Sequence, residues 1–341
     1  MTSGAAAPPY PVVVLLLEQF AMIAFTSTLE PLREANWVLQ RRAFDWMVVS
    51  HDGRAVTASN GLSLNVDGSI QDVVDCAMVI VCSSFDPHLY ITPKILAWLR
   101  KLDRQGAMIG GVETGAYVLA RAGLLDGCRA TIHWENAQSM IEAFPKVQLT
   151  GRIFEIDGRR FSAAGASAAM DMMLHFIGMR VGRHVAASVA EQFIYNRLRG
   201  SESPQRLAAS ERMNMRHPRL RRLLQFMDSH LHERLDIAAI AGAEKISERE
   251  LRRLFRTHLD DSPQDYHRTL RLEKARLMLR QTDLSVTDIA SGCGFASSSD
   301  FSRAFRRKFG CKPVDDRKEI YVLDRSQAPI AEAPNEAIAK A

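Results

Sequence analysis

The sequence predicts two domains: an α/β sandwich with a largely parallel sheet, followed by an all-α domain that contains two helix-turn-helix units. Three observations support this prediction. Apolar runs of strand length alternate with helical patterns as far as residue 199. A short helix, a tight turn and an arginine-rich helix then occur twice, about 50 residues apart. At 341 residues and 47% hydrophobic content, the chain can build a separate core in each domain.

In the N-terminal domain, continuous apolar runs predict buried strands and longer periodic segments predict helices. The expected strands are Pro11–Leu17, Phe44–Ser50, Ala77–Cys82, Ala107–Val112, Ala130–His133, Ile153–Ile156 and Phe161–Ala163. The expected helices are Ala24–Gln40, Pro87–Gln105, Gly115–Ala122 and the long helical region Ser167–Arg199. This alternation is typical of a sheet whose strands run mostly in parallel.

Composition indicates where the domains begin and end. We expect a loose lead-in at 1–9, the α/β domain at 10–199, a polar linker at 200–218, the helical domain at 219–320 and a disordered tail at 321–341. The apolar run Val12–Leu17 is too short for a signal sequence or a membrane span. We therefore expect a cytoplasmic protein with no membrane association.

Cysteine spacing and charge limit the possible partners. The five cysteines show neither paired metal-ligand spacing nor an even disulfide framework, so we expect reduced thiols, no metal site and no cofactor. The net charge of +5 is uneven: residues 201–320 hold 24 Lys and Arg against 18 Asp and Glu. This modest excess favours double-stranded DNA as the partner of the helical domain.

The helical domain carries an internal repeat, in which Leu235–Pro263 aligns with Leu284–Pro313. The aligned pairs are Ile240 with Ile289, Ala241 with Ala290, Ser247 with Ser297, Leu251 with Phe301, and Phe255 with Phe305. In both copies the apolar residues recur at helical spacing, which predicts a core face. A short helix, a turn and a second helix outline a helix-turn-helix reader of the DNA major groove.

The second helix of each copy supplies the candidate DNA contacts. In the first copy they are Ser247, Arg249, Glu250, Arg252, Arg253 and Arg256, where Ser247 and Glu250 form a capping box. In the second copy they are Ser297, Ser298, Ser299, Asp300, Ser302, Arg303, Arg306, Arg307 and Lys308. A single arginine stripe is also the ordinary solvated face of a helix, whereas two stripes at one repeat distance favour DNA binding. Which arginine meets a base and which a phosphate stays open.

This region resembles the AraC/XylS family of transcription regulators. The resemblance covers Leu220–Lys318 and rests on the repeat and on the run from Asp288 to Gly310, with Ser262-Pro263 ahead of Tyr266. It implies two helix-turn-helix units joined by a long helix at 263–281. The chain departs from the family at 260–261, where glycine is usual, and at 313–317, where Pro-Ser-x-Tyr-Arg is usual. The packing at the end of the last unit is therefore left open.

Three strand ends in the N-terminal domain are candidate ligand positions, because ligands of parallel sheets bind at the carboxyl ends of strands. They are Glu18–Phe20 with Phe25 beyond it, Gly110–Gly115, and His133–Glu135. The segment Gly110–Gly115 has the pattern of a strand that turns sharply into a helix, with glycine on both sides of the turn.

The segments Ile109–Asp126 and Ala130–Trp134 are similar to the PfpI/class I amidotransferase-like superfamily. Together with the C-terminal resemblance, and with Glu30–Asn36 and Phe154–Leu174, they point to the GlxA-type branch of AraC regulators, which includes glycine betaine- and carnitine-responsive members. The resemblance implies an amidotransferase-like, flavodoxin-like parallel sheet. Enzymes of the superfamily carry a cysteine nucleophile at the sharp turn, where this chain has Glu113. Because a carboxylate cannot replace a thiolate, we expect no catalytic residue and a scaffold retained for binding.

The resemblance suggests a small effector, either a quaternary ammonium compound or an amino acid. The candidate ligand-binding residues are Phe20, Phe25, Glu113, Thr114, His133, Trp134 and Glu135. The two glutamates could neutralise a cation, and the aromatic rings could provide cation–π faces. The alternative stays open that the aromatic residues belong to the core and that the histidine is structural.

Three functions compete at this stage. The first is a ligand-responsive transcription regulator, expected to be an activator that works with RNA polymerase as a homodimer. The second is a PfpI-type hydrolase or amidase with a basic appendage, which Glu113 disfavours because it occupies the nucleophile position. The third is a nucleoid-associated protein that binds any duplex with a steep dependence on salt.

Overall fold

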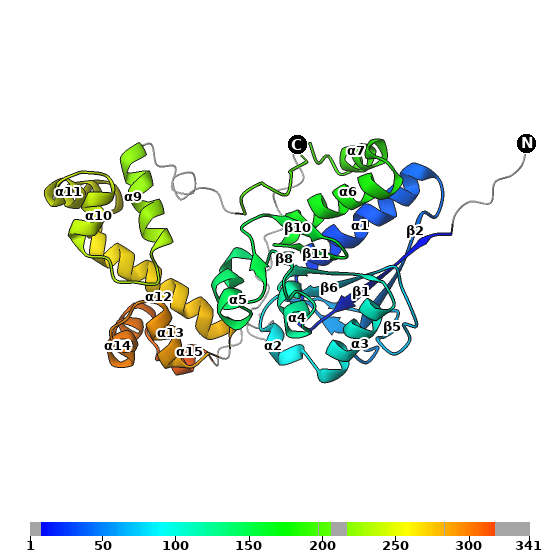
Figure 1. Cartoon of the computed structure of the whole chain (residues 1–341), viewed down its shortest axis with the longest axis horizontal. Helices are drawn as coiled ribbons and strands as arrows, with labels where there is room; N and C mark the ends of the chain where they lie inside the picture. Colours follow the sequence, from blue (N-terminus) through cyan, green and yellow to red (C-terminus); the bar gives the residue numbers. More distant parts are fainter. Residues whose placement is uncertain (1–7, 197, 206–216, 283, 318–341) are drawn as a thin grey trace, which may run out of the picture.

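The computed structural model describes residues 8–196, 198–205, 217–282 and 284–317. It contains an α/β domain and a separate helical domain, joined side by side as Figure 1 shows. The predicted tail lies outside the described residues. The structure describes only residues 8–9 of the predicted lead-in, and only 200–205 and 217–218 of the predicted linker. The fold class predicted from the sequence is confirmed.

The α/β domain is built on a seven-stranded sheet in the order β10-β11-β7-β6-β1-β2-β5. Every pairing in it is parallel except that of β10 with β11. The strands are β1 (Tyr10–Leu16), β2 (Phe44–Ser50), β5 (Gly68–Ser69), β6 (Met78–Ser83), β7 (Met108–Glu113), β10 (Phe154–Asp157) and β11 (Arg160–Ala163). The two-residue strand β5 at one edge was not expected from the sequence.

Strand β1 shows why the sheet is covered on both faces. Val12, Val14 and Leu16 join one apolar cluster, while Val13 and Leu15 join the other. Successive strand residues point to opposite faces, so an unbroken apolar run requires a hydrophobic layer on each side. The first layer comprises α1 (Met22–Leu39), α6 (Ala166–Val181) and α7 (Arg183–Gln192), and the second comprises α3 (Pro93–Arg104), α4 (Gly115–Arg121) and part of α5 (Ala137–Ala143).

Two predicted helices are broken in the structure. The segment predicted as one helix at 87–105 forms α2 (Pro87–Tyr90) and α3, because Pro93 disfavours a helical conformation in the preceding Thr92. Thr92 is extended and caps α3 by accepting from the amide of Ile95. The helical region predicted at 167–199 is divided at Gly182, whose φ of 111° lies outside the helical range, and it ends at α7.

The strand predicted at 130–133 is shorter in the structure and begins one residue earlier. Only β8 (Arg129–Ala130) forms, and it pairs with β9 (Gln148–Leu149) in a separate two-stranded sheet. The chain then enters a short 3₁₀ turn, η1 (Trp134–Asn136), which leads into α5. A further small hairpin, β3 (Val56–Thr57) with β4 (Ser63–Leu64), follows β2.

The helical domain repeats the same arrangement twice. The helices are α9 (Pro218–Ser229), α10 (Ile237–Ala243), α11 (Glu248–Leu259), α12 (Pro263–Gln281), α13 (Val286–Gly292), α14 (Ser298–Phe309) and α15 (Pro313–Asp316). Helices α10 and α11 pack with α9 around one core, and α13 and α14 pack with the second half of α12 around another. The long helix α12 therefore joins two separately cored units, as the family resemblance implied.

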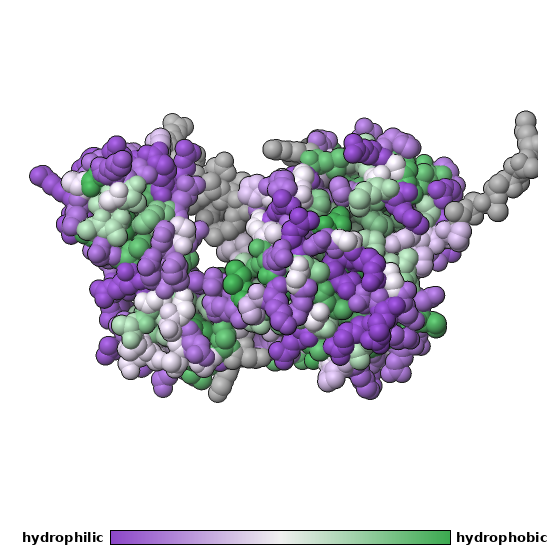
Figure 2. Space-filling model, viewed as in Figure 1, coloured by the Kyte–Doolittle hydropathy of each residue, from purple (hydrophilic) through white to green (hydrophobic). Residues whose placement is uncertain are grey.

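The two domains meet where α12 packs against η1 and α5. A cleft of about 730 Å³ runs along this junction, lined by Trp134 and Ile141 from the α/β domain and by Leu270, Leu277 and Phe309 among others from the helical domain. Hydrophobic residues form only separate patches on the face seen in Figure 2. None of the described helices is both long enough and apolar enough to cross a lipid bilayer.

Candidate DNA interface and ligand cavity

The second helix of each unit begins at a capping serine. In α11 the hydroxyl of Ser247 accepts from the amide of Glu250 at 3.2 Å, and in α14 the hydroxyl of Ser297 accepts from the amide of Asp300 at 3.1 Å. The buried side chains are Leu251, Leu254 and Phe255 in α11 and Phe301 and Phe305 in α14. Each core face leaves the remaining positions of its helix for the solvent.

The four predicted arginines of α11, Arg249, Arg252, Arg253 and Arg256, are exposed. They line a hollow of about 600 Å³ together with residues 260–263. Arg252 pairs with Glu248 at 3.1 Å, whereas the other three have no ion pair among the described residues. An exposed ion pair contributes little free energy, so all four guanidinium groups can exchange water for phosphate.

The predicted basic residues of α14 are also exposed, namely Arg303, Arg306, Arg307 and Lys308. Two of them have a carboxylate at the outer limit of an ion pair, at 4.0 Å from Arg303 to Asp300 and 4.0 Å from Lys308 to a glutamate of α12. Ser299 at the start of the helix is exposed as well. The structure thus presents two basic helix surfaces at equivalent positions of the two units.

Two of the predicted polar contacts have structural partners, and a third is half-buried. The Glu250 carboxylate does not complete the predicted capping box, because it pairs with Arg219 of α9 at 2.8 Å. Ser298 donates its hydroxyl to Thr287 of α13 at 3.2 Å, and Ser302 is half-buried. The contacts of Glu250 and Ser298 hold α11 and α14 to neighbouring helices, which leaves the arginines as the stronger candidates for DNA contact.

Helix α12 holds both units through buried polar side chains that sequence reasoning missed. The ring of His267 lies 3.1 Å from the carbonyl of His230 in the first unit. Arg271, one turn further on, donates to the carbonyl of Cys293 at 2.6 Å and lies over the ring of Phe295. Both His267 and Arg271 are buried, so α12 fixes the end of α9 and the end of α13 relative to each other.

The departure from the family pattern at α15 also has a structural explanation. Asp316, where the family has tyrosine, is fully buried and accepts from Arg276 and Arg280 of α12 at 2.8–3.1 Å. Burial alone would raise the pKa of Asp316, but the hydrogen bonds from the two arginines outweigh it and lower the pKa. An ion-pair network therefore fastens α15 to α12.

In the α/β domain, β7 turns into α4 at Glu113, which has the positive φ of 57°. The glycines on both sides of the turn are required by close contacts. A Cβ at Gly115 would lie 2.2 Å from the carbonyl oxygen of Val81, and one at Gly111 would lie 2.4 Å from the carbonyl carbon of Gly115. The predicted sharp turn, the elbow, therefore exists and lifts the Glu113 side chain out of the sheet.

The carboxyl group of Glu113 sits in a confined environment. One oxygen accepts from the amide of Ala166 at the start of α6, at 3.1 Å. Burial raises the pKa of Glu113 to about 7, against the lowering effect of that amide, and the charge of Glu135 adds to the rise. Near neutral pH this carboxyl group can therefore either donate a proton or carry a negative charge.

The Glu113 side chain lines a cavity of about 210 Å³, which we call the elbow cavity. It is lined by Glu113, His133, Trp134, Ile153, Ala164, Gly165, Ala166, Ser167, Ala168, Arg199 and Gln205. Burial lowers the pKa of His133, although the Glu135 carboxylate 3.6 Å away acts in the opposite direction. Three of the predicted ligand residues are thus brought together here.

The remaining predicted ligand residues lie elsewhere, so those predictions are corrected. Phe20 is fully buried and packs edge-to-face with the buried Phe25 in the core beneath α1, which leaves neither ring surface open to a ligand. Thr114 is buried and donates its hydroxyl to the carbonyl of Ser84 at 2.6 Å. Glu135 lines the cleft between the domains rather than the elbow cavity.

Two polar residues of the cavity were missed because they arrive from distant segments. Arg199 pairs with the buried Asp171 at 2.6 Å and donates to Ser167 at 2.8 Å. Gln205 comes from the segment that leaves the domain. Neither has a local pattern, and only the tertiary fold brings them to the elbow.

Comparisons with known proteins agree with this geometry. A family model described as DJ-1/PfpI family matches residues 11–179, and one described as helix-turn-helix domain matches residues 237–319. The chain is 42% identical to the HTH-type transcriptional regulator CdhR of Pseudomonas aeruginosa, over 94% of each chain. The chain belongs to the AraC-type transcriptional regulators that carry a DJ-1/PfpI domain.

Other members of this family support the same assignment. The chain is 37% identical to the HTH-type transcriptional regulator GlxA of Rhizobium meliloti, over 89% of this chain and 94% of that protein. The crystal structure of an AraC family transcriptional regulator from Pseudomonas putida matches 54% of this chain and all of its own, at 31% identity and a TM-score of 0.51. The resemblance read from the sequence is confirmed, and the chain is a transcriptional regulator with a helix-turn-helix DNA-binding domain.

Proposed function

We propose that this AraC-type regulator is a sequence-specific transcription activator, controlled by a small nitrogen-containing metabolite bound in the elbow cavity. One observation carries the DNA-binding part: two helices, α11 and α14, expose arginines at equivalent positions of duplicated units that α12 holds together. Such a pair can enter successive segments of the major groove. The regulator acts as a homodimer that recruits RNA polymerase in the cytoplasm.

The elbow cavity supports the effector part of the proposal. Glu113 has one carboxyl oxygen held by the Ala166 amide, which leaves the other to pair with a cation. Trp134 is the one predicted aromatic residue that lines the cavity, so it takes the cation–π role first assigned to three rings. A quaternary ammonium compound or an amino acid of small volume matches this chemistry.

A PfpI-type hydrolase or amidase is the alternative, and the thiols argue against it. No described cysteine lines the elbow cavity. Cys82, on the strand next to the elbow, is fully buried, and burial raises its pKa well above the usual range for a thiol. A buried neutral thiol is a poor nucleophile. Turnover of a thiol-hydrolase substrate that disappeared in Cys128→Ala would favour the enzyme instead.

The DNA-binding proposal is tested by alanine substitution in the full-length chain. Arg303→Ala and Arg306→Ala should each weaken operator binding in gel shifts at moderate salt, without a change in circular dichroism. Arg183→Ala, an exposed arginine of α7, is the matched control and should bind normally. Operator binding that is unchanged in both α14 variants would contradict the role we assign to that helix.

A further inference from the structure

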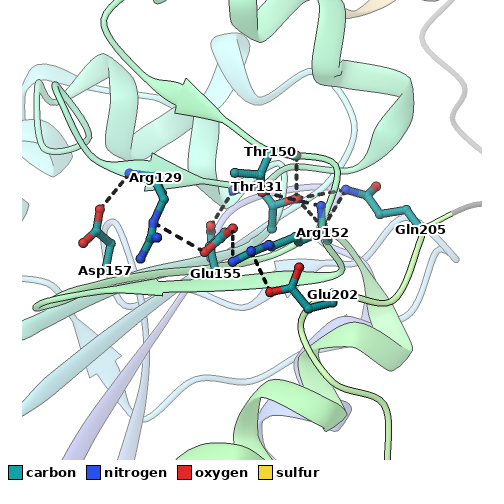
Figure 3. A network of polar contacts seen from close by, with 9 residues as sticks. Arg129, Thr131, Thr150, Arg152, Glu155, Asp157, Glu202 and Gln205 are labelled. Carbon is teal, nitrogen blue, oxygen red and sulfur yellow. Dashed lines mark hydrogen bonds and ion pairs between the residues drawn. The ribbon is translucent and has the colours of Figure 1, made fainter.

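The segment Ser201–Gln205, which leaves the α/β domain towards α9, is docked along the domain that it leaves. The carbonyl of Ser201 accepts from the amide of Ile153 at 3.2 Å, and Pro204 forms an antiparallel bridge with Arg152. The Glu202 carboxylate pairs with Arg152 at 2.6 Å (Figure 3). The docking therefore combines backbone pairing with a charged contact.

Gln205 makes the most specific of these contacts. Its side-chain nitrogen lies 2.9 Å from the Thr131 hydroxyl, 2.9 Å from the Arg152 carbonyl and 3.1 Å from the Ile132 carbonyl. Two backbone carbonyls around one atom fix the orientation of the amide, because an oxygen there would face two acceptors. Figure 3 shows the contacts of Gln205 with Thr131 and Arg152.

The same side chain belongs to the elbow cavity. Gln205 lines that cavity together with Glu113 and His133. Its partners Thr131 and Ile132 directly precede His133 in the chain. A molecule bound at Glu113 would thus lie against the residue that docks the exit segment.

We propose that Ser201–Gln205 is a strap that converts occupancy of the elbow cavity into a change in the tether to the DNA-binding domain. When the strap is docked, the chain is held against the α/β domain as far as Gln205. When it is released, its five residues are freed and add up to about 17 Å to the reach of the connection between the two domains. A longer tether lowers the effective concentration of one domain at the other, which weakens the packing of α12 on η1 and α5.

The docked strap is poised for control by a ligand. The side-chain oxygen of Gln205 is buried and has no hydrogen-bond partner among the described residues. An unpaired buried carbonyl opposes docking, so the docked and released states lie closer in free energy than the strap's contacts alone would make them. A molecule in the cavity that packs against Gln205 or satisfies its oxygen favours the docked state. This step rests on the proposed function of the cavity.

The ligand-free chain gives the first test, by amide hydrogen exchange at Ile153. Gln205→Ala should speed exchange at this amide by about tenfold, the effect of a lost hydrogen bond of ordinary strength. Ser203→Ala is the control, since the hydrogen bond of Ser203 is made by its backbone amide, to the carbonyl of Gly200, and Ile153 should exchange at the wild-type rate in this variant. Equal exchange in wild type and Gln205→Ala would overturn the proposal.

The second test uses glycine betaine, carnitine and glycine as probes with the full chain. A probe that raises the melting temperature of both proteins should slow Ile153 exchange and change operator affinity in wild type but not in Gln205→Ala. An identical response of the two proteins would refute the strap. If no probe binds, the exchange rate of Ile153 in the ligand-free chain still tests whether Gln205 holds the strap in its docked position. If Arg303→Ala and Arg306→Ala both keep wild-type operator binding, the proposed DNA-binding function fails, whatever the exchange at Ile153 shows.

Discussion

Replacing Glu113 with glutamine should stabilise the α/β domain at neutral pH and leave its stability unchanged in mild acid. Glutamine has nearly the same shape and can still accept from the Ala166 amide, but it cannot ionise. The folded-state pKa of Glu113 is about 7, above the ordinary value of 4.5. The stability that the protonated side chain provides is therefore complete below pH 4.5 and is lost as the pH rises through about 7.

The size of the effect follows from that difference. The interval from 4.5 to about 7 corresponds to about 3 kcal/mol at most. Because Glu113 keeps some exposure to solvent, we expect Glu113→Gln to exceed wild type by about 2 kcal/mol at pH 8. Near pH 4 both proteins carry a neutral side chain, so their free energies of unfolding should agree.

Urea unfolding of the full chain, followed by tryptophan fluorescence, measures this directly. The four tryptophans, Trp37, Trp46, Trp98 and Trp134, all belong to the α/β domain, and Trp134 also lines its junction with the helical domain. Glu191→Gln, an exposed position of α7, controls for the loss of one negative charge. A stability difference for Glu113→Gln that is the same at pH 4 and pH 8 would refute the reasoning.

Ligand affinity should follow the same ionisation. A cationic effector binds the charged form of Glu113, so its affinity should rise as the pH rises through about 7. Titration calorimetry at pH 6 and pH 8 checks this, and Glu113→Gln should bind weakly at both values. An affinity that falls with rising pH would indicate that the carboxyl group acts as a proton donor instead.

Two further predictions concern the helical domain. Gly294→Ala should destabilise the second unit by about 2 kcal/mol or more, because the φ of Gly294 is +67° and a Cβ there would lie 2.7 Å from the Cα of Glu233. Lys245 occupies the equivalent turn of the first unit with a φ of +52°, so Lys245→Gly should stabilise that unit by about 0.5–1 kcal/mol. Thermal unfolding followed at 222 nm compares the two, and equal effects would contradict the strain argument. Asp316→Asn should cost about 2 kcal/mol in the same measurement, since Arg276 and Arg280 lose a buried counter-charge but keep partial access to water; an unchanged midpoint would show that α15 is not fastened by this network.

The duplicated units could be predicted because their signals are local. The capping serines Ser247 and Ser297 and the helical spacing of the apolar residues lie within one or two turns of each other. Likewise, the unbroken apolar run of β1 predicts a strand buried on both faces without knowledge of the strands and helices that pack on it. Such patterns predict an element and its buried face from sequence alone.

The ligand cavity could be predicted only in part, because its members are distant in sequence. Glu113 was identifiable from the glycine-flanked turn, but Arg199 and Gln205 reach it only through the tertiary fold. Phe20 and Phe25 were wrongly assigned to the ligand site. A position after a strand does not show whether a side chain points to the core or to the ligand, and both rings are buried in the core. The partners of Asp316 were hidden for the same reason, since they lie 36 and 40 residues earlier in the chain.

The central claim is sequence-specific DNA binding, and a two-step experiment tests it most directly. The full-length regulator first selects binding sites from random duplex DNA. The selected and unselected DNA are then titrated over a range of salt concentrations. We expect the selected sequence to bind at least about 10³-fold more tightly than random duplex. Where Arg253 or Arg307 holds a phosphate, its alanine variant should lower the slope of log affinity against log salt by about 1. Equal affinity for selected and random DNA would contradict the account and indicate a protein that binds any duplex.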